Sequence, residues 1–287
     1  MDASAAPSEA PAGVGITAVA VAMARARESR RADRMFHDPY AQSFVAAAET
    51  VLGTDEWPPL VAWVDLFYSR GVVRTRFIDD FVCDAVAGGC TQVVLLGAGL
   101  DARAFRLPLS SADVFEVDTP SVFAFKDKVL ADAGARSTGR SRTAVRADLR
   151  EDFAARLADS TFDPGRPTAW VAEGVLPYLT ADQARHVVTD VGGLSAPGSR
   201  LVFEHSDKPG PDPRAAAAAL TTPGADRIST MVRGGLGSDG RDWVAGRGWT
   251  VAITERGELG PRYGRPDDRL AGGQFIIATR DRPGRRT

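Results

Sequence analysis

The segment from Val93 to Asp101 constrains the fold of this chain more than any other. Four apolar residues, Val93 to Leu96, are followed at once by Gly97-Ala98-Gly99 and a helix-like segment. Such a run is typical of a strand buried in a parallel sheet, and the glycines allow a tight turn that a ligand can approach closely. A second apolar run ends at Asp118, twenty-one residues after Gly97. This pattern indicates a Rossmann-type sheet that binds a nucleoside, whose ribose hydroxyls donate to the carboxylate.

The glycine turn alone does not identify the cofactor. Gly97-x-Gly99-x-x-Ala102 satisfies the looser fingerprint of NAD(P)-dependent oxidoreductases. Asp101 argues against a dinucleotide, because a carboxylate at a helix start would repel the pyrophosphate that this position binds. S-adenosylmethionine carries no phosphate and has a cationic amino-acid end, so it tolerates the acid. A simple role for Asp101 as a helix cap remains the alternative.

Strands and helices alternate through the second and third quarters of the chain, which predicts a parallel, doubly wound α/β sheet. The expected strands are 92–97, 113–118, 143–147, 168–173 and 199–205. The expected helices between them are 101–107, 120–133, 150–158 and 180–193. Two further strands, 250–255 and 274–279, have a loop without a clear helix between them and would add an antiparallel hairpin at the sheet edge.

The remaining segments suggest how the chain is divided. Residues 1–13 have the composition of a disordered tail. Residues 14–90 form a helical lid and cap, in which Asp38-Pro39 should start a new helix and 57–87 is a further helix. Residues 91–287 form the core, with an insertion rich in Pro, Gly and Ala at 206–240 and a short helix near 239–246.

Composition narrows the class of partner. A net charge of −2 favours neither nucleic acid nor an anionic membrane. Apolar runs stay well short of the roughly 18 residues of a membrane helix, and the first residues lack a signal-peptide pattern, so we expect a cytoplasmic protein. Cys83 and Cys90 lack the spacing of a metal site, and no metal is expected. A small molecule is the expected acceptor or substrate.

Other candidate site residues follow strand ends, where open α/β sheets bind ligands. Asp148 can accept from an adenine amino group while Leu149 packs on the ring, although Asp148 as the N-cap of 150–158 is equally acceptable. Glu173 ends an apolar strand and, if buried, needs an ammonium or arginine partner. Tyr178 and His205 are weaker candidates for a catalytic role, because such residues are more often structural.

Four segments together resemble one known family. They are Thr17 to Tyr40, Leu96 to Arg103, Phe115 to Pro120 and Ala172 to Leu179. These motifs are similar to those of leucine carboxyl methyltransferase-like proteins. They are most similar to an actinobacterial branch of S-adenosylmethionine-dependent O-methyltransferases, some of which act on polyketides and other secondary metabolites. The resemblance spans about residues 14–280.

The resemblance implies a Rossmann-like class I methyltransferase with a mostly parallel seven-stranded sheet, an antiparallel C-terminal edge strand and an N-terminal helical lid. It implies that Arg74 pairs with the methionine carboxylate, helped by Arg25 or Arg27. The other implied cofactor-binding residues are Gly97, Gly99, Asp118, Asp148, Leu149 and Glu173. The acceptor is then a carboxylate, which needs no base, or a phenol, for which His205 would be the first candidate base. A non-catalytic cofactor-binding protein remains possible on the same fold.

Overall fold

The computed structural model describes residues 14–53, 55–206 and 231–281. The expected tail 1–13 and most of the expected insertion 206–240 lie outside the described residues. The strands are β1 (Gln92–Leu96), β2 (Asp113–Asp118), β3 (Ser141–Arg146), β4 (Thr168–Ala172), β5 (Arg200–His205), β6 (Trp249–Glu255) and β7 (Gln274–Arg280). The longer helices are α1 (Val14–Ser29), α2 (Ala41–Glu49), α3 (Trp57–Ala87), α5 (Pro120–Asp132) and α7 (Ala181–Gly193).

The strands form one sheet in the order β3-β2-β1-β4-β5-β7-β6. β1 pairs in parallel with β2 and β4, β2 with β3, and β4 with β5. β7 is antiparallel to both β5 and β6, so the last two strands form the expected hairpin and β6 is an edge strand. The prediction of a mostly parallel, seven-stranded sheet with an antiparallel C-terminal addition is therefore confirmed.

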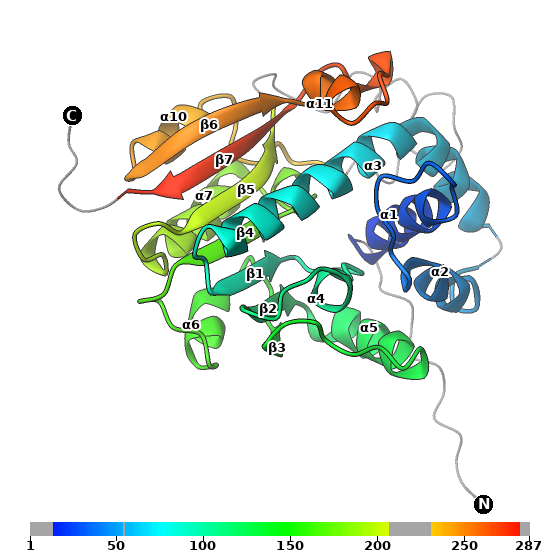
Figure 1. Cartoon of the computed structure of the whole chain (residues 1–287), viewed down its shortest axis with the longest axis horizontal. Coiled ribbons are helices and arrows are strands. Elements are labelled where there is room, and N and C mark those ends of the chain that lie inside the picture. Colours follow the sequence, from blue (N-terminus) through cyan, green and yellow to red (C-terminus); the bar gives the residue numbers. More distant parts are fainter. Residues whose placement is uncertain (1–13, 54, 207–230, 282–287) are drawn as a thin grey trace, which may run out of the picture.

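Alternate residues of the five inner strands enter two separate cores, because successive side chains of a strand point to opposite faces. Val93 and Leu95 of β1 pack on one face with α1 and α3. Val94 and Leu96 pack on the other face with α7 and the short helices α6 (Phe153–Ala158) and α10 (Gly240–Ala245). Figure 1 shows α3 lying across the first face, with α1 and α2 beside it.

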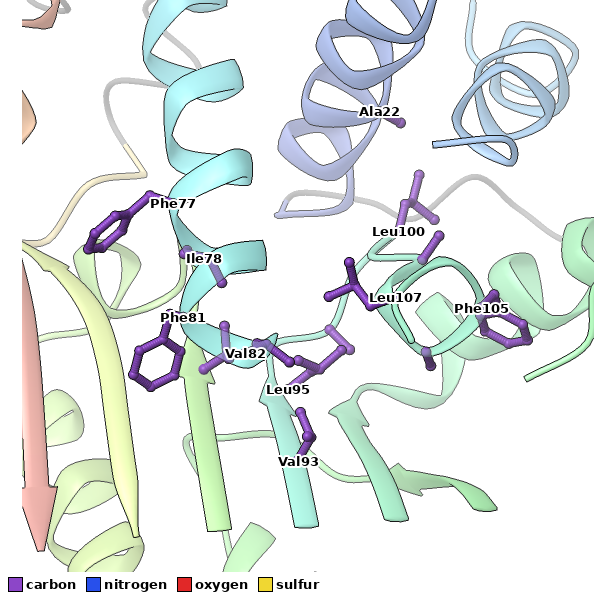
Figure 2. Close-up of a cluster of buried hydrophobic side chains, with 14 of the residues drawn as sticks. Ala22, Phe77, Ile78, Phe81, Val82, Val93, Leu95, Leu100, Phe105 and Leu107 are labelled. Atoms are coloured by element: carbon purple, nitrogen blue, oxygen red, sulfur yellow. The ribbon is translucent and has the colours of Figure 1, made fainter. Parts of the chain in front are cut away.

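The second half of α3 is part of the core of the sheet domain. Phe77, Ile78, Phe81 and Val82 are buried and pack over β1 (Figure 2). They have the spacing of one helix face, in which residues three and four apart are neighbours. The first half of α3 packs against α1, so one continuous helix joins the expected N-terminal cap to the sheet.

Some element boundaries differ from the sequence prediction. The helix expected at 101–107 is the single turn α4 (Arg103–Arg106), and α6 begins at Phe153 instead of 150. Asp38 does precede a new helix: its Oδ1 accepts from the backbone N–H of Tyr40 at 3.0 Å and of Ala41 at 3.1 Å, at the start of α2.

The expectation of a loop without a helix between the last two strands is wrong. The helix α11 (Arg256–Arg262) and the 3-10 turn η2 (Asp268–Leu270) lie there. The sequence conceals α11 because Gly257, Gly260 and Pro261 all have low helix propensity. Tertiary packing stabilises α11 in spite of this low propensity. A Cβ on Gly260 would lie 2.5 Å from Leu270 Cδ1, and Leu259 is fully buried.

Candidate functional site

A cavity of about 400 Å³ opens at the carboxyl ends of the parallel strands. Its floor is the glycine turn after β1, and its walls are the residues that follow β2, β3 and β4. Gly15, Thr17, Ala18, Val21 and Arg25 of α1 also line it. Every residue that the sequence assigns to cofactor binding contributes to its lining: Arg74, Gly97, Gly99, Asp118, Asp148, Leu149 and Glu173.

The glycine turn needs its glycines for both conformation and space. Gly97 has φ +61° and Gly99 has φ +42°, in the left-handed region that side chains rarely adopt. A Cβ on Gly97 would lie 2.7 Å from Val175 Cγ2, and a Cβ on Gly99 would lie 3.3 Å from Ala18 Cβ of α1. The turn therefore brings backbone close to both the cavity and the helix above it.

Asp118 is held at the end of β2 by the glycine turn itself. Its Oδ2 accepts from the backbone N–H of Gly99, and its Oδ1 accepts from that of Thr119, both at 2.7 Å. Burial raises the pKa of the Asp118 carboxyl, against the effect of these hydrogen bonds. Each carboxylate oxygen has about two acceptor positions, so each oxygen retains acceptor capacity for hydroxyls in the cavity.

Asp148 makes a tight turn after β3. Its Oδ1 accepts from the backbone N–H of Arg150 at 2.8 Å, and its Oδ2 pairs with Arg150 Nη2 at 2.5 Å. The interpretation of Asp148 as a helix cap is not supported, because Asp152 is the N-cap of α6 and accepts from Ala155 N at 3.1 Å. Leu149 is buried beside Asp148 in the cavity wall.

Glu173, directly after β4, binds three arginines from three different helices. Its carboxylate accepts from Arg25 Nη2 at 3.1 and 3.2 Å, Arg74 Nε at 2.9 Å and Arg103 Nη1 at 2.5 Å. We call Glu173 with these arginines the Glu173 cluster. Burial alone would raise the pKa of Glu173, but the three guanidinium groups hold it well below its usual range. The partner that the sequence demands for this carboxylate is thus arginine.

Arg74 also reaches a second carboxylate. Its Nη1 donates to Glu204 Oε1 at 2.9 Å, while Glu204 Oε2 accepts from the backbone N–H of Gly174 at 2.5 Å. A guanidinium has five N–H groups, so Glu173 and Glu204 leave Arg74 with further donors beside the cavity. The structure places Arg74 at the site but gives it a structural role as well.

Arg25 and Arg27, which the sequence leaves as alternatives, are separated by the geometry of α1. Arg25 is buried in the cavity wall and binds Glu173. Arg27 is half-exposed, pairs with Asp65 at 2.6 Å and stacks on the ring of Tyr68. Of the two, only Arg25 lines the cavity.

Asp101 is engaged by one fully buried arginine. Its Oδ1 accepts from the backbone N–H of Arg103 at 2.8 Å, at the start of α4, and its Oδ2 pairs with Arg103 Nη1. Arg103 Nε also donates to Asp79 at 2.7 Å. Asp101 therefore has the local backbone role that the sequence allows, and it keeps a carboxylate at the cavity wall where a pyrophosphate would lie.

The two weaker catalytic candidates lie in different places. Tyr178 lines the cavity and is hydrogen-bonded to Thr17 of α1. Burial raises the pKa of the Tyr178 phenol, so the group is protonated at neutral pH. His205 is buried at the end of β5 against Gly240, where a Cβ would lie 2.9 Å from its Cε1, and it does not line the cavity.

Several residues of the site carry signals that sequence analysis did not use. Glu204 closes an apolar strand just as Glu173 does, and the same argument identifies it. Trp63 lines the cavity from the first half of α3, and no pattern distinguishes it from a packing residue. Asp79 is found only in the structure, and so are the ion pairs of Arg103, which the sequence shows only as the end of a family motif. Among residues 14–53, 55–206 and 231–281, no group of His, Cys, Asp and Glu is arranged to hold a metal ion, and no helix there is long and apolar enough to cross a membrane.

Comparison with known proteins gives a consistent result. The model of the leucine carboxyl methyltransferase family matches residues 18–192. A candidate S-adenosyl-L-methionine-dependent methyltransferase of Frankia alni is 41% identical over 274 residues, which cover 95% of this chain and 96% of the relative. A similarly described protein of Saccharopolyspora erythraea is 40% identical over 273 residues, covering 89% of this chain and 91% of the relative.

Solved structures share the fold. A candidate methyltransferase of Thermobifida fusca has a TM-score of 0.52 at 18% identity, covering 94% of this chain and 95% of that one. A DUF574 family protein of Streptomyces avermitilis has a TM-score of 0.52 at 16% identity, covering 92% of this chain and 97% of that one. At these identities the likeness concerns the fold alone.

The Glu173 cluster predicts a large effect of removing its most buried arginine. Arg103→Met leaves Asp79, Asp101 and Glu173 buried without their common partner, and should lower the free energy of unfolding by about 3–5 kcal/mol at pH 7. Urea denaturation measures this. Arg27→Met is the matched control, because it removes an exposed ion pair and should cost less than about 1 kcal/mol. Equal, small losses in both variants would show that the cluster contributes little to stability.

The same cluster predicts a pH dependence. Because the pKa of folded Glu173 is lowered, its contribution to stability is present above the unfolded pKa of about 4.3 and is lost as the pH falls toward the folded pKa. Removing Arg103 raises the folded pKa and shrinks this contribution. The difference in unfolding free energy between wild type and Arg103→Met should therefore be smaller at pH 4 than at pH 7. A constant difference would contradict the assignment of this electrostatic role.

Proposed function

Since the chain belongs to the leucine carboxyl methyltransferase family, we propose that it is an S-adenosylmethionine-dependent O-methyltransferase that acts on a small molecule, such as a polyketide-like secondary metabolite. The single observation that carries the proposal is the cavity at the carboxyl ends of β1 to β4. It brings a ribose-type acid, a glycine turn and the Glu173 cluster to one cavity.

From β3 through β2 and β1 to β4, the lining residues match the adenine, the ribose and the methionine end of the cofactor in turn. Asp118 accepts from the ribose hydroxyls, with Gly97 and Gly99 beneath. Asp148 and Leu149 contact the adenine. Glu173 lies at the methionine end, where Arg74 and Arg25 offer guanidinium donors to the cofactor carboxylate.

The charges of the cavity disfavour the alternative of a nicotinamide dinucleotide. The acidic lining residues are Asp101, Asp118, Asp148 and Glu173, and the basic ones are Arg25, Arg74 and Arg150. Each of these arginines is already paired with a carboxylate. A pyrophosphate would bring two further negative charges beside these acids, whereas a sulfonium and an ammonium bring positive charge.

A carboxylate acceptor fits the site better than a phenol. All three histidines of the chain lie among the described residues, and none lines the cavity. Tyr178 is held protonated by burial, so it donates or accepts a hydrogen bond but does not act as a base at neutral pH. A carboxylate is already anionic and needs no base.

In the chemical step, the main role of the protein is to place the acceptor beside the cofactor. S-adenosylmethionine supplies a methyl group that is activated on a sulfonium. The residues of this chain hold the acceptor oxygen in line with that group and exclude water, which can supply roughly 7–11 kcal/mol of the barrier. Thr17, Val21, Trp63 and Tyr178 also line the cavity, Tyr178 is hydrogen-bonded to Thr17, and we assign the acceptor to these residues.

We assign α1 the role of a lid. It contributes five residues to the cavity lining and is tied to the sheet by Arg25–Glu173 and Thr17–Tyr178. An element that covers a cofactor moves when the cofactor exchanges, and such elements come from the less stable part of a fold.

The ribose assignment predicts a specific loss of affinity. Asp118→Ala removes two charge-assisted hydrogen bonds to the ribose and should weaken binding of S-adenosylhomocysteine by about 2–4 kcal/mol. Calorimetry measures the affinity, with NAD(H) as the competing ligand class. The control is Asp132→Ala, which removes an exposed aspartate at the end of α5. Unchanged affinity in a folded Asp118→Ala variant, or wild-type preference for NAD(H), would contradict the assignment.

The acceptor assignment predicts the chemistry of the product. With isotopically labelled S-adenosylmethionine and a panel of small carboxylic acids and phenols, label should enter the acids as methyl esters, which mild alkali cleaves. The rate should be flat from pH 6 to 9, because the acceptor carboxylate stays ionised. Alkali-stable label, with a rate that rises with pH, would instead identify a phenol, and no transfer to any acceptor would favour a non-catalytic cofactor-binding protein.

The lid assignment predicts where the cofactor protects backbone amides. Addition of S-adenosylhomocysteine should slow hydrogen exchange in α1 by a larger factor than in β1 or β4, which are already protected by the core. Peptide-level mass spectrometry resolves these segments. If α1 shows no change while the glycine turn is protected, the cofactor binds but α1 is a packing element.

A further inference from the structure

The strand β6 leaves one side of the sheet open. Within the described residues it pairs with β7 only, and it runs along the outer edge of the sheet in Figure 1. An edge strand presents unpaired backbone N–H and C=O groups to any strand that can match them.

The register shows which backbone groups point outward. Arg280 N–H donates to Ser199 O at 2.7 Å on the β5 side, and Asp281 N–H donates to Gly248 O at 3.2 Å on the β6 side. Successive residues of a strand direct their backbone N–H and C=O groups to opposite sides. The backbone groups of Thr250, Ala252 and Thr254 therefore bond to their partners in β7. The N–H and C=O groups of Trp249, Val251, Ile253 and Glu255 therefore face away from the sheet.

This edge lacks the features by which proteins usually prevent strand pairing. The segment from Thr250 to Thr254 contains no charged residue and no proline. Ile253 is 37% exposed and is one of two large apolar residues that are exposed within the described ranges; the other is Val61 of α3. An apolar side chain beside an open row of hydrogen-bonding groups favours a further strand as its neighbour.

The sequence of the edge is complementary to itself. The segment from Thr250 to Thr254 reads Thr-Val-Ala-Ile-Thr. Ala252 is at its centre, Val251 and Ile253 flank Ala252, and the two threonines are at the ends. When the segment is reversed, every residue meets one of the same shape class. A twofold axis at Ala252 would therefore match a β-branched residue with a β-branched residue at each flanking position.

We propose that two copies of this chain associate through β6 in antiparallel register about Ala252, so that the two sheets become one continuous sheet. Val251 lies opposite Ile253 of the second copy, and the outward backbone groups of both strands then pair with each other. Ala252 faces its own equivalent as a non-hydrogen-bonded pair, because its backbone groups bind β7.

The charged residues near the ends of the strand are compatible with this register. Glu255 lies opposite Trp249 of the second copy, and the Arg280 guanidinium lies over that Trp249 ring at 5.4 Å from its centre. Opposite charges are thereby brought near each other at both ends. A register shifted by two residues in one direction would place Ala252 opposite Thr254, and in the other direction opposite Thr250, so both lose the Thr250–Thr254 pair.

The first experiment measures the mass of the full chain in solution by analytical ultracentrifugation at micromolar concentrations. The wild type should sediment as a dimer, and Ile253→Lys should shift the population to the monomer without changing the circular dichroism spectrum. Val61→Lys is the matched control, because it alters the other exposed apolar residue and should leave the dimer intact. A monomeric wild type, or a dimer that survives Ile253→Lys, overturns the proposal.

The second experiment tests the register by cross-linking. Residues facing each other in a non-hydrogen-bonded pair have Cα atoms about 4.5 Å apart, within the range that a disulfide spans. Mild oxidation should therefore convert Ala252→Cys to a covalent dimer. Thr250→Cys should give only the background of the wild type, which carries Cys83 and Cys90, because Thr250 faces Thr254. Equal cross-linking of the two variants overturns this register.

Discussion

The structure depends on the charge of one carboxylate. Glu173 is buried directly after β4, and it accepts hydrogen bonds from arginines on α1, α3 and α4. A buried carboxylate without partners is strongly unfavourable, so the three helices must hold their arginines around it. The same ion pairs tie α1 to the cavity wall above the glycine turn. Helices α1, α3 and α4 and the sheet thus meet at a single acidic side chain.

The topology of the sheet explains why the site forms there. The chain runs outward from β1 to β3 and then returns to place β4 on the other side of β1. A crevice forms outside the carboxyl ends of the strands where the order reverses. Gly97 follows β1 and Glu173 follows β4 at that point, while Asp118 lies at the end of the neighbouring β2. Residues far apart in the chain therefore line one cavity.

The cavity has an unusual balance of charge for a nucleotide site. Its arginines already bind carboxylates, and its acids outnumber them. Such a site suits a cofactor that carries positive charge at its reacting end, as a member of a methyltransferase family requires. Tyr178 lines the cavity, and none of the three histidines, all of which lie among the described residues, does so. This lining is the reason for our proposal that the protein acts mainly by placing the acceptor and excluding water.

The sequence by itself determined the sheet, and it identified the glycine turn and the acid that line the cavity at the strand ends. The strands, the glycine turn and Asp118 were predictable because they depend on local patterns: apolar runs, φ angles that glycine permits, and an acid at a strand end. Glu173 was predictable for the same reason as Asp118, and the family motifs added Arg74. Only the tertiary structure decided what these side chains bind, because that depends on residues distant in sequence. It paired Arg74 with Glu204 as well as Glu173, chose Arg25 over Arg27, and stabilised α11 by packing where propensity opposes a helix.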